Sequence, residues 1–257
     1  MGKQHLGKLS RHVIDSYMRE PNRQLTVAVI GAGGTGSYLI PEIAKLHFML
    51  KKIYDYPGID VHVYDPDIVE EHNYIRSNFS PSDIGRYKAN VIVSRVNKFY
   101  GLQWSAEQEF YKGKTSFNVI ILAVDSVEAR KTIIANLIEN HNQIYAHENH
   151  LHYIIDVGNE KNHGQVIIAQ DPANEERELL FTTELFPDLK DDDNPSCSMA
   201  ESLSKQSLYI NRHMALITAE VLKTLCTELI IDFDAVFVNT EDLVMNKTML
   251  NVVEERA

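Results

Sequence analysis

The chain has 257 residues, of which 44% are hydrophobic, so it can bury a sizeable core as one large domain or two small ones. Its formal net charge of −11 disfavours a nucleic-acid-binding protein, because no bulk excess of cations is present to neutralise a phosphate backbone. The N-terminus lacks the apolar stretch of a signal peptide, and no apolar run approaches the roughly 20 residues that span a bilayer. With only 2 cysteines, we expect a cytoplasmic protein with no membrane segment, no disulfide framework and no structural zinc site.

The first predicted unit is an apolar strand, a glycine turn and a helix. The strand covers 25–30 (LTVAVI), and the helix covers 37–50 with one apolar face. The turn between them contains Gly31, Gly33, Gly34 and Gly36. Glycines in this context let the backbone approach a phosphate, which the N-terminus of the following helix attracts. The turn therefore indicates a nucleotide site, and a merely tight structural turn is the alternative.

Strands and helices then alternate as in a parallel α/β sheet. Further strands are expected over 60–64, 117–124, 153–157 and 165–170. Helices are expected over 84–100, 128–139 and 200–229. An acidic segment over 174–195 is interpreted as a long crossover, and 235–253 as a closing hairpin. The predicted fold class is α/β: a Rossmann-like, mostly parallel sheet flanked by helices, with an antiparallel C-terminal extension of the sheet.

The downstream motifs narrow the choice of nucleotide. Asp65 ends the second strand, where a dehydrogenase carries its ribose-binding acid, but here it lies beyond the usual spacing of about 20 residues from the glycines. The order of motifs resembles the ThiF/MoeB/HesA family, the prokaryotic relatives of ubiquitin-activating enzymes, whose pattern is GxGGxGS, DxDxV with NxxR, DiGxxKA, and an Asp after a strand. The matching residues are the four turn glycines, Ser37, Asp65, Asp67, Val69, Asn73, Arg76, Asp83, Gly85, Lys88, Ala89 and Asp125.

The resemblance covers roughly residues 25 to 230, since 156–158, 164–166 and 195–198 also match family segments. Ser77 stands where the family usually has Gln, and paired Cys-x-x-Cys motifs are missing. The missing motifs and an insertion over 51–59 indicate a divergent member, such as the PRTRC-system type. The resemblance implies residues 1–24 as an N-terminal helical, dimer-contact segment and 25–257 as a single adenylating domain. Its nucleotide-binding half is 25–140, and its partner-binding half contains the crossover loop 174–199.

The resemblance also implies an enzyme that uses ATP and Mg2+ to adenylate the C-terminal carboxylate of a small ubiquitin-like or sulfur-carrier protein ending in Gly-Gly. Attack of a carboxylate on the α-phosphorus needs cations around the phosphates and an anion to hold magnesium. The family roles carry over to Arg76 and Lys88 as cations, Asn73 as a donor to phosphate, Asp65 as ribose acceptor, and Asp125 as metal ligand. Asp67 either contacts the nucleotide or stabilises the loop. Without these roles, the two cations would be solvated surface charges, the asparagine would form a turn, and Asp125 would only cap a helix.

Two further residues carry roles that only the resemblance suggests. Cys197, beside an acidic run, is a candidate acceptor of the acyl group or site of a persulfide, and a buried or incidental thiol is the alternative. Arg11 is the candidate arginine that one subunit of a homodimer supplies to the other, with Arg23 as a substitute. Two other functions stay open: a nicotinamide- or flavin-binding oxidoreductase, and a non-catalytic scaffold that keeps the fold.

Overall fold

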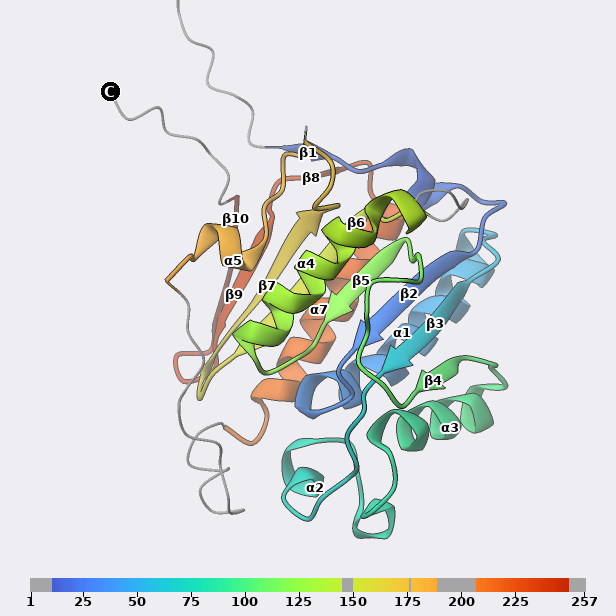
Figure 1. The fold of residues 1–257 in the computed structure, drawn as a ribbon, viewed down its shortest axis with the longest axis vertical. Helices are drawn as coiled ribbons and strands as arrows, with labels where there is room; N and C mark the ends of the chain where they lie inside the picture. Colours follow the sequence, from blue (N-terminus) through green and yellow to red (C-terminus); the bar gives the residue numbers. More distant parts are fainter. Residues whose placement is uncertain (1–10, 145–149, 176, 189–206, 250–257) are drawn as a thin grey trace, which may run out of the picture.

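The computed structural model describes residues 11–144, 150–175, 177–188 and 207–249 (Figure 1). Its parallel strands are β2 (Leu25–Ile30), β3 (Ile59–Tyr64), β4 (Ser105–Glu107), β5 (Val119–Leu122) and β6 (Tyr153–Asn159). The antiparallel strands are β7 (His163–Gln170), β9 (Ala235–Asn239) and β10 (Val244–Thr248). Within the described residues they form one 8-stranded sheet in the order β10-β9-β7-β6-β5-β2-β3-β4. The predicted fold class, including the antiparallel extension, is confirmed.

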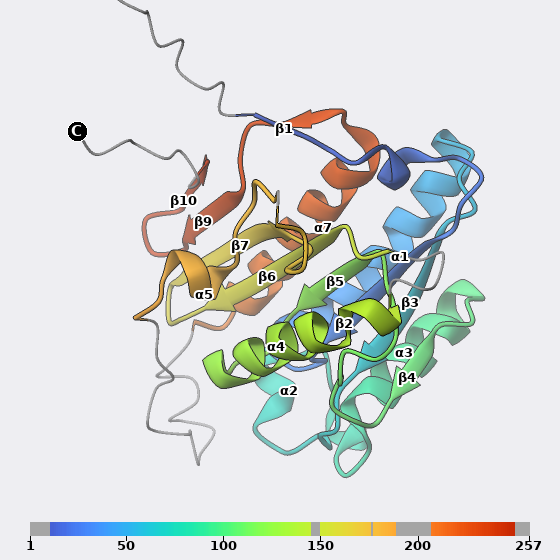
Figure 2. The ribbon, with the colours of Figure 1, turned by 45° about the horizontal axis from the view of Figure 1, so that its top comes forward.

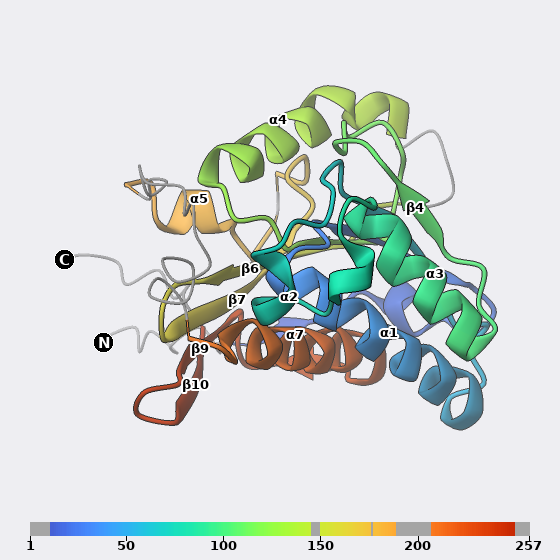
Figure 3. The ribbon, with the colours of Figure 1, turned by 90° about the horizontal axis from the view of Figure 1, so that it is seen from below.

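Helices cover both faces of this sheet (Figures 1 and 3). One face carries α1 (Gly34–Ile53), α3 (Lys88–Tyr100) and α7 (Ile210–Thr227), and the other carries α4 (Val127–Ile144) and the short α5 (Thr182–Leu185). Side chains alternate along β2, so Val27 and Val29 belong to the core under α1 and α7, whereas Ala28 and Ile30 belong to the core under α4. Burial on both faces explains why the central strands are continuous apolar runs.

The N-terminal segment lies at the amino ends of the parallel strands, away from the glycine turn (Figure 2). In its described part, 11–24, the chain forms β1 (His12–Val13) and a single 3-10 turn, η1 (Ser16–Arg19), in place of the predicted helical segment. β1 pairs with β8 (Ile230–Ile231) in a second, 2-stranded sheet. The Asp15 side chain accepts a hydrogen bond from the Tyr17 amide at 2.9 Å and so caps the turn.

The helix expected over 84–100 begins later, at Lys88. A 3-10 turn, η2 (Pro81–Asp83), is closed by a capping box between Ser80 and Asp83, and Gly85 follows with φ +83, which ends any helical continuation. Part of the acidic crossover, 174–195, contains α5. The described part of the helix predicted over 200–229 is α7, and none of the described helices is long and apolar enough to cross a membrane.

Candidate functional site

A cleft of about 1580 Å3 lies at the carboxyl ends of the parallel strands. Strand order reverses there, because β2 is followed on one side by β3 and on the other by β5, and a crevice forms between the diverging loops. Its walls come from the glycine turn, the residues after β3, the start of α3 and the loops after β5 and β6. The sheet topology therefore brings together segments that are far apart in the chain.

Steric packing explains most of the glycines in the turn. Gly31 has φ +98, and a Cβ at this position would lie 2.5 Å from the carbonyl oxygen of Ala123. A Cβ at Gly36 would lie 1.9 Å from the oxygen of Gly31, and one at Gly34 would lie 2.7 Å from the Asn211 side chain. Gly33 is different, because a Cβ there would meet nothing within 4 Å, and this residue lines the cleft. The turn thus presents bare backbone to the cleft at Gly33.

Asp65 is buried beneath this turn. Its carboxylate accepts a hydrogen bond from the Ala32 amide at 2.6 Å and one from the Asp67 amide at 2.9 Å. Burial raises the pKa of Asp65, and the two amide donors act in the opposite direction. Asp65 is not among the residues that line the cleft. In this structure the Asp65 carboxylate holds the backbone of the glycine turn through the Ala32 amide. The sequence did not predict this contact, and ribose binding by Asp65 stays a prediction.

Asp67 and Lys88 form an ion pair on the cleft wall. The Lys88 Nζ donates to Asp67 Oδ2 at 2.9 Å, and the Lys88 amide donates to the Asp67 carbonyl at 2.9 Å. The Lys88 side chain is 13% exposed, whereas that of Asp67 is 64% exposed. A largely desolvated ammonium held by one carboxylate keeps donors for a second anion. The two hydrogen bonds between Asp67 and Lys88 correspond to loop stabilisation, one of the two roles considered for Asp67.

The short helix α2 (Asn73–Arg76) carries the next two predicted residues. Asn73 Oδ1 accepts from the Glu70 amide at 2.9 Å, so this asparagine stabilises its own turn as well as lining the cleft. Arg76 also lines the cleft and is half-buried, and burial lowers the pKa of its guanidinium. A partly desolvated guanidinium interacts more strongly with phosphate than a fully hydrated one.

Asp125 is exposed in the cleft immediately after β5. The hydroxyl of Ser126 accepts from the Ala129 amide at 3.1 Å, so Ser126 supplies the side-chain cap at the start of α4. Among the described residues, no group of three or more His, Cys, Asp or Glu side chains could hold a metal ion. A lone carboxylate nevertheless fits Mg2+, which usually takes one or two protein carboxylates together with substrate phosphates and water.

Arg130 is a cleft residue that the sequence motifs do not reveal. Its Nε donates to Asp156 Oδ1 at 2.8 Å, and both side chains are only 7% exposed. One terminal nitrogen donates to the carbonyls of Val124 and Val157, each at 2.7 Å. Arg130 thus ties the end of β5 to the end of β6 beside Asp125. An arginine in an amphipathic helix is usually solvated, so the sequence held no local signal for this burial.

A second group that the motifs do not reveal joins the glycine turn to the other half of the chain. Thr35, Asn159 and Asn211 all line the cleft and share hydrogen bonds through the Asn211 carboxamide. Each residue alone is unremarkable in sequence, because polar side chains of this kind occur on most surfaces and caps. The packing of α7 against both α1 and β6 brings them together.

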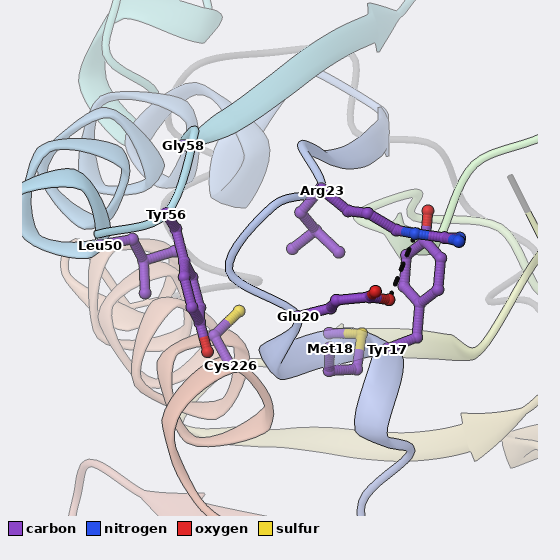
Figure 4. A pocket seen from close by; sticks show the side chains of 9 residues that line it. Tyr17, Met18, Glu20, Arg23, Leu50, Tyr56, Gly58 and Cys226 are labelled. Carbon is purple, nitrogen blue, oxygen red and sulfur yellow. Dashed lines mark ion pairs between the residues drawn. The ribbon is translucent and has the colours of Figure 1, made fainter. Parts of the chain in front are cut away.

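Two of the candidates, Arg11 and Arg23, do not line the cleft of their own chain, and a third cannot be placed. Cys197 lies outside the described residues. Arg11 is exposed beside the small β1–β8 sheet, and Arg23 forms an ion pair with Glu20 at 3.2 Å and lies over the Tyr17 ring at 5.0 Å (Figure 4). Arg11 directly precedes β1, and Arg23 lies just before the amino end of β2, so a role for either in this site would require a neighbouring subunit.

A small pocket separate from the cleft is lined by Arg23, Leu25 and the other cysteine, Cys226 (Figure 4). Cys226 is fully buried on α7, and burial raises its pKa to about 12. A thiol with this pKa is protonated at neutral pH and is a poor nucleophile. Cys226 is therefore a residue of the hydrophobic core.

The fold and the site define a Rossmann-like α/β protein with a cleft at the carboxyl ends of its parallel strands. The model of the ThiF family matches residues 12–256, and the chain belongs to this family. It is 34% identical over 122 residues to the NEDD8-activating enzyme E1 catalytic subunit of Schizosaccharomyces pombe, covering 44% of this chain and 24% of that protein. The corresponding Arabidopsis thaliana subunit is 34% identical over 117 residues, covering 42% and 23%. The chain thus spans about a quarter of the length of these relatives.

Solved structures with the same fold include E. coli MccB determined with ATP, with a TM-score of 0.57 and 14% sequence identity. A structure of PaaA has a TM-score of 0.56 and 17% identity. In both comparisons the match covers 88% of this chain and 64% of the other. At this level of identity the likeness establishes the fold alone.

Proposed function

We propose that this protein uses ATP to adenylate the C-terminal carboxylate of a small ubiquitin-like or sulfur-carrier protein. The observation that carries the proposal is the gathering of Gly33, Asn73, Arg76, Lys88 and Asp125 around one cleft at the carboxyl edge of a parallel sheet. Family membership supports the same reaction, and the NEDD8-activating subunits and the MccB structure solved with ATP agree with it.

The residues suit the charge changes of adenylation. A carboxylate oxygen attacks the α-phosphorus, the acyl–phosphate bond forms, and the bond between the α- and β-phosphates breaks, so that pyrophosphate leaves with the electron pair. Negative charge accumulates on phosphate oxygens, where Lys88 and Arg76 supply cations and the Gly33 backbone leaves room for close approach. Asn73 supplies a neutral amide for the same oxygens.

Asp125 is the proposed protein ligand for Mg2+. It is exposed in the cleft, and its carboxylate is of the type that this ion prefers. Bound there with the triphosphate, Mg2+ supplies charge neutralisation on the phosphate oxygens. Arg130 holds the carbonyl of Val124 at 2.7 Å and so positions the loop that carries Asp125.

The cleft continues onto the antiparallel half of the sheet, which supports a macromolecular substrate. Gly158, Gln165, Phe237 and Asn246 are register partners across β6, β7, β9 and β10, and all four line the cleft. A flexible Gly-Gly tail lying along this floor would point its carboxylate toward the glycine turn. Cys197, outside the described residues, stays a candidate acceptor of the acyl group in a later step.

The position of Asp65 does not separate ATP from a dinucleotide, because both interpretations assign the ribose to this acid, whose oxygens here accept backbone amides. A thermal-shift assay separates the two functions. A shift of the melting temperature by ATP with Mg2+, and none by NADH, is the expected result. Stabilisation by NADH alone would overturn the adenylation proposal.

Exchange of labelled pyrophosphate into ATP, with a small protein ending in Gly-Gly as the acceptor, tests the reaction itself. Asp125→Ala should lower the exchange rate by about 100-fold or more, the usual scale for losing an electrostatic partner of the transition state. Cys197→Ala should keep exchange and abolish any thioester. Glu139→Ala, which removes an exposed charge outside the cleft from α4, the helix that follows Asp125, is the matched control. Full exchange by Asp125→Ala would refute the site assignment, and ATP binding without exchange would favour a scaffold.

A further inference from the structure

The Asn211 carboxamide is the meeting point of three hydrogen bonds at the base of the cleft. Its Oδ1 accepts from Asn159 Nδ2 at 3.0 Å and lies 3.3 Å from the Thr35 hydroxyl, and its Nδ2 donates to the carbonyl of Arg76 at 3.3 Å. Asn211 is 4% exposed, so water cannot easily replace these partners.

The partners of Asn211 lie on separate elements of the fold. Thr35 is in the first turn of α1, directly after the glycines, and Asn159 is the last residue of β6. Arg76 ends α2, where a short helix leaves carbonyl groups without intrahelical partners. Asn211 itself is in the first turn of α7. One side chain therefore joins the glycine turn, the α2 helix and the end of the last parallel strand.

Asn211 also sets the distance between α7 and the glycine turn. A Cβ at Gly34 would lie 2.7 Å from the Asn211 Cγ, so the two helix N-termini meet at van der Waals contact with no space for a larger residue. α1 and α7 lie side by side along this face of the sheet (Figure 3). Movement of the α7 N-terminus would consequently displace both the turn and the Arg76 backbone.

We propose that Asn211 is a positioning residue for the triphosphate, acting through the glycine turn and Arg76. This inference rests on the proposed function, because it concerns the same nucleotide cleft. Loss of its carboxamide removes the direct link between the end of α2 and the first turn of α1, so the groups that meet phosphate are held less firmly at their present spacing. The part of the cleft that would contact the nucleoside is not held by Asn211, so adenosine binding should change little.

Equilibrium binding of ATP with Mg2+, and of adenosine by competition, separates positioning from general destabilisation. Asn211→Ala should weaken ATP binding about tenfold, the scale of one or two lost buried hydrogen bonds, and should change adenosine binding less than twofold. Asn211→Asp, nearly the same in shape, should weaken ATP binding further, because it replaces the donor to Arg76 with a negative charge near the phosphates. This second variant gives the answer if the alanine variant does not fold.

Thr218→Ala is the matched control. Thr218 is also a buried polar residue of α7, but its hydroxyl donates only to the Met214 carbonyl at 2.7 Å, within the helix. It should lose stability comparably and keep the wild-type affinity for ATP. Unchanged ATP affinity in both Asn211 variants would overturn the proposal, as would equal losses for ATP and adenosine. Failure of the wild-type protein to bind ATP would instead refute the proposed function.

Discussion

The buried pair of Arg130 and Asp156 offers the sharpest test of how the cleft is held together. The guanidinium satisfies Asp156 Oδ1 at 2.8 Å and the carbonyls of Val124 and Val157 at 2.7 Å each. Arg130→Met removes all these donors while keeping much of the length of the side chain. It leaves the Asp156 carboxylate, whose side chain is only 7% exposed, without its cationic partner.

The expected loss follows from the burial of both groups. Breaking a buried ion pair by removing one partner typically costs about 3–5 kcal/mol, because the remaining charge stays desolvated. For a chain of this size that corresponds to a decrease of roughly 10 °C in melting temperature. Replacing both groups together, as in Arg130→Met with Asp156→Leu, should recover most of this loss, since no buried charge is left uncompensated.

Urea unfolding of the wild type, both single variants and the double variant gives the coupling free energy directly. The stability losses of the two single variants should not add up in the double variant, which should be more stable than Arg130→Met alone. Its ATP affinity should still be reduced, because the Val124 carbonyl beside Asp125 is no longer held. A loss below about 1 kcal/mol in Arg130→Met, or simple additivity in the double variant, would refute the reasoning.

Two further predictions concern the glycine turn and a buried histidine. Gly36→Ala should lower the free energy of unfolding by about 2 kcal/mol or more, because its Cβ would lie 1.9 Å from the Gly31 oxygen. Gly33→Ala should mainly weaken ATP binding, because its Cβ would meet nothing within 4 Å. A larger loss of stability in Gly33→Ala than in Gly36→Ala, measured by urea titration, would contradict the packing. Burial is the main cause that holds the pKa of His47 below its usual value of about 6.5, ahead of opposing contributions from Ile59 and Asp60. As pH falls below about 6.5 the unfolded chain therefore binds a proton that the folded one does not, and stability should decrease by up to about 1.4 kcal/mol per pH unit. His47→Gln should make the free energy of unfolding depend less steeply on pH between pH 7 and 5. An unchanged dependence would mean that other groups cause the loss of stability.

Local patterns were sufficient to predict most of the helices and strands. The run LTVAVI became β2 within its expected bounds, and the apolar stretch 117–124 contains β5. The order of glycine turn, acidic loop and Lys88 was also enough to predict family membership, because such motifs are contiguous segments that can be identified without knowledge of their tertiary contacts. The start of α3 was misplaced because the capping box of Ser80 and Asp83 forms a separate turn before it.

The roles of particular side chains needed the tertiary structure. Asp65 and Asp67 are two residues apart and chemically identical, yet one is buried under the glycine turn and the other faces the cleft with Lys88. Only the packing of the Asp65–Asp67 loop against the turn decides which carboxylate is desolvated.

The sequence by itself determined the element types, the parallel core and the family, since these follow from hydrophobic periodicity and from residues close together in the chain. Tertiary structure alone decided that Arg130 and Asn211 belong to the cleft. Asn211, for example, donates to a carbonyl of Arg76 that lies 135 residues away in sequence. The energy of a buried polar group depends on which partners the fold supplies, and no local pattern of residues encodes that choice.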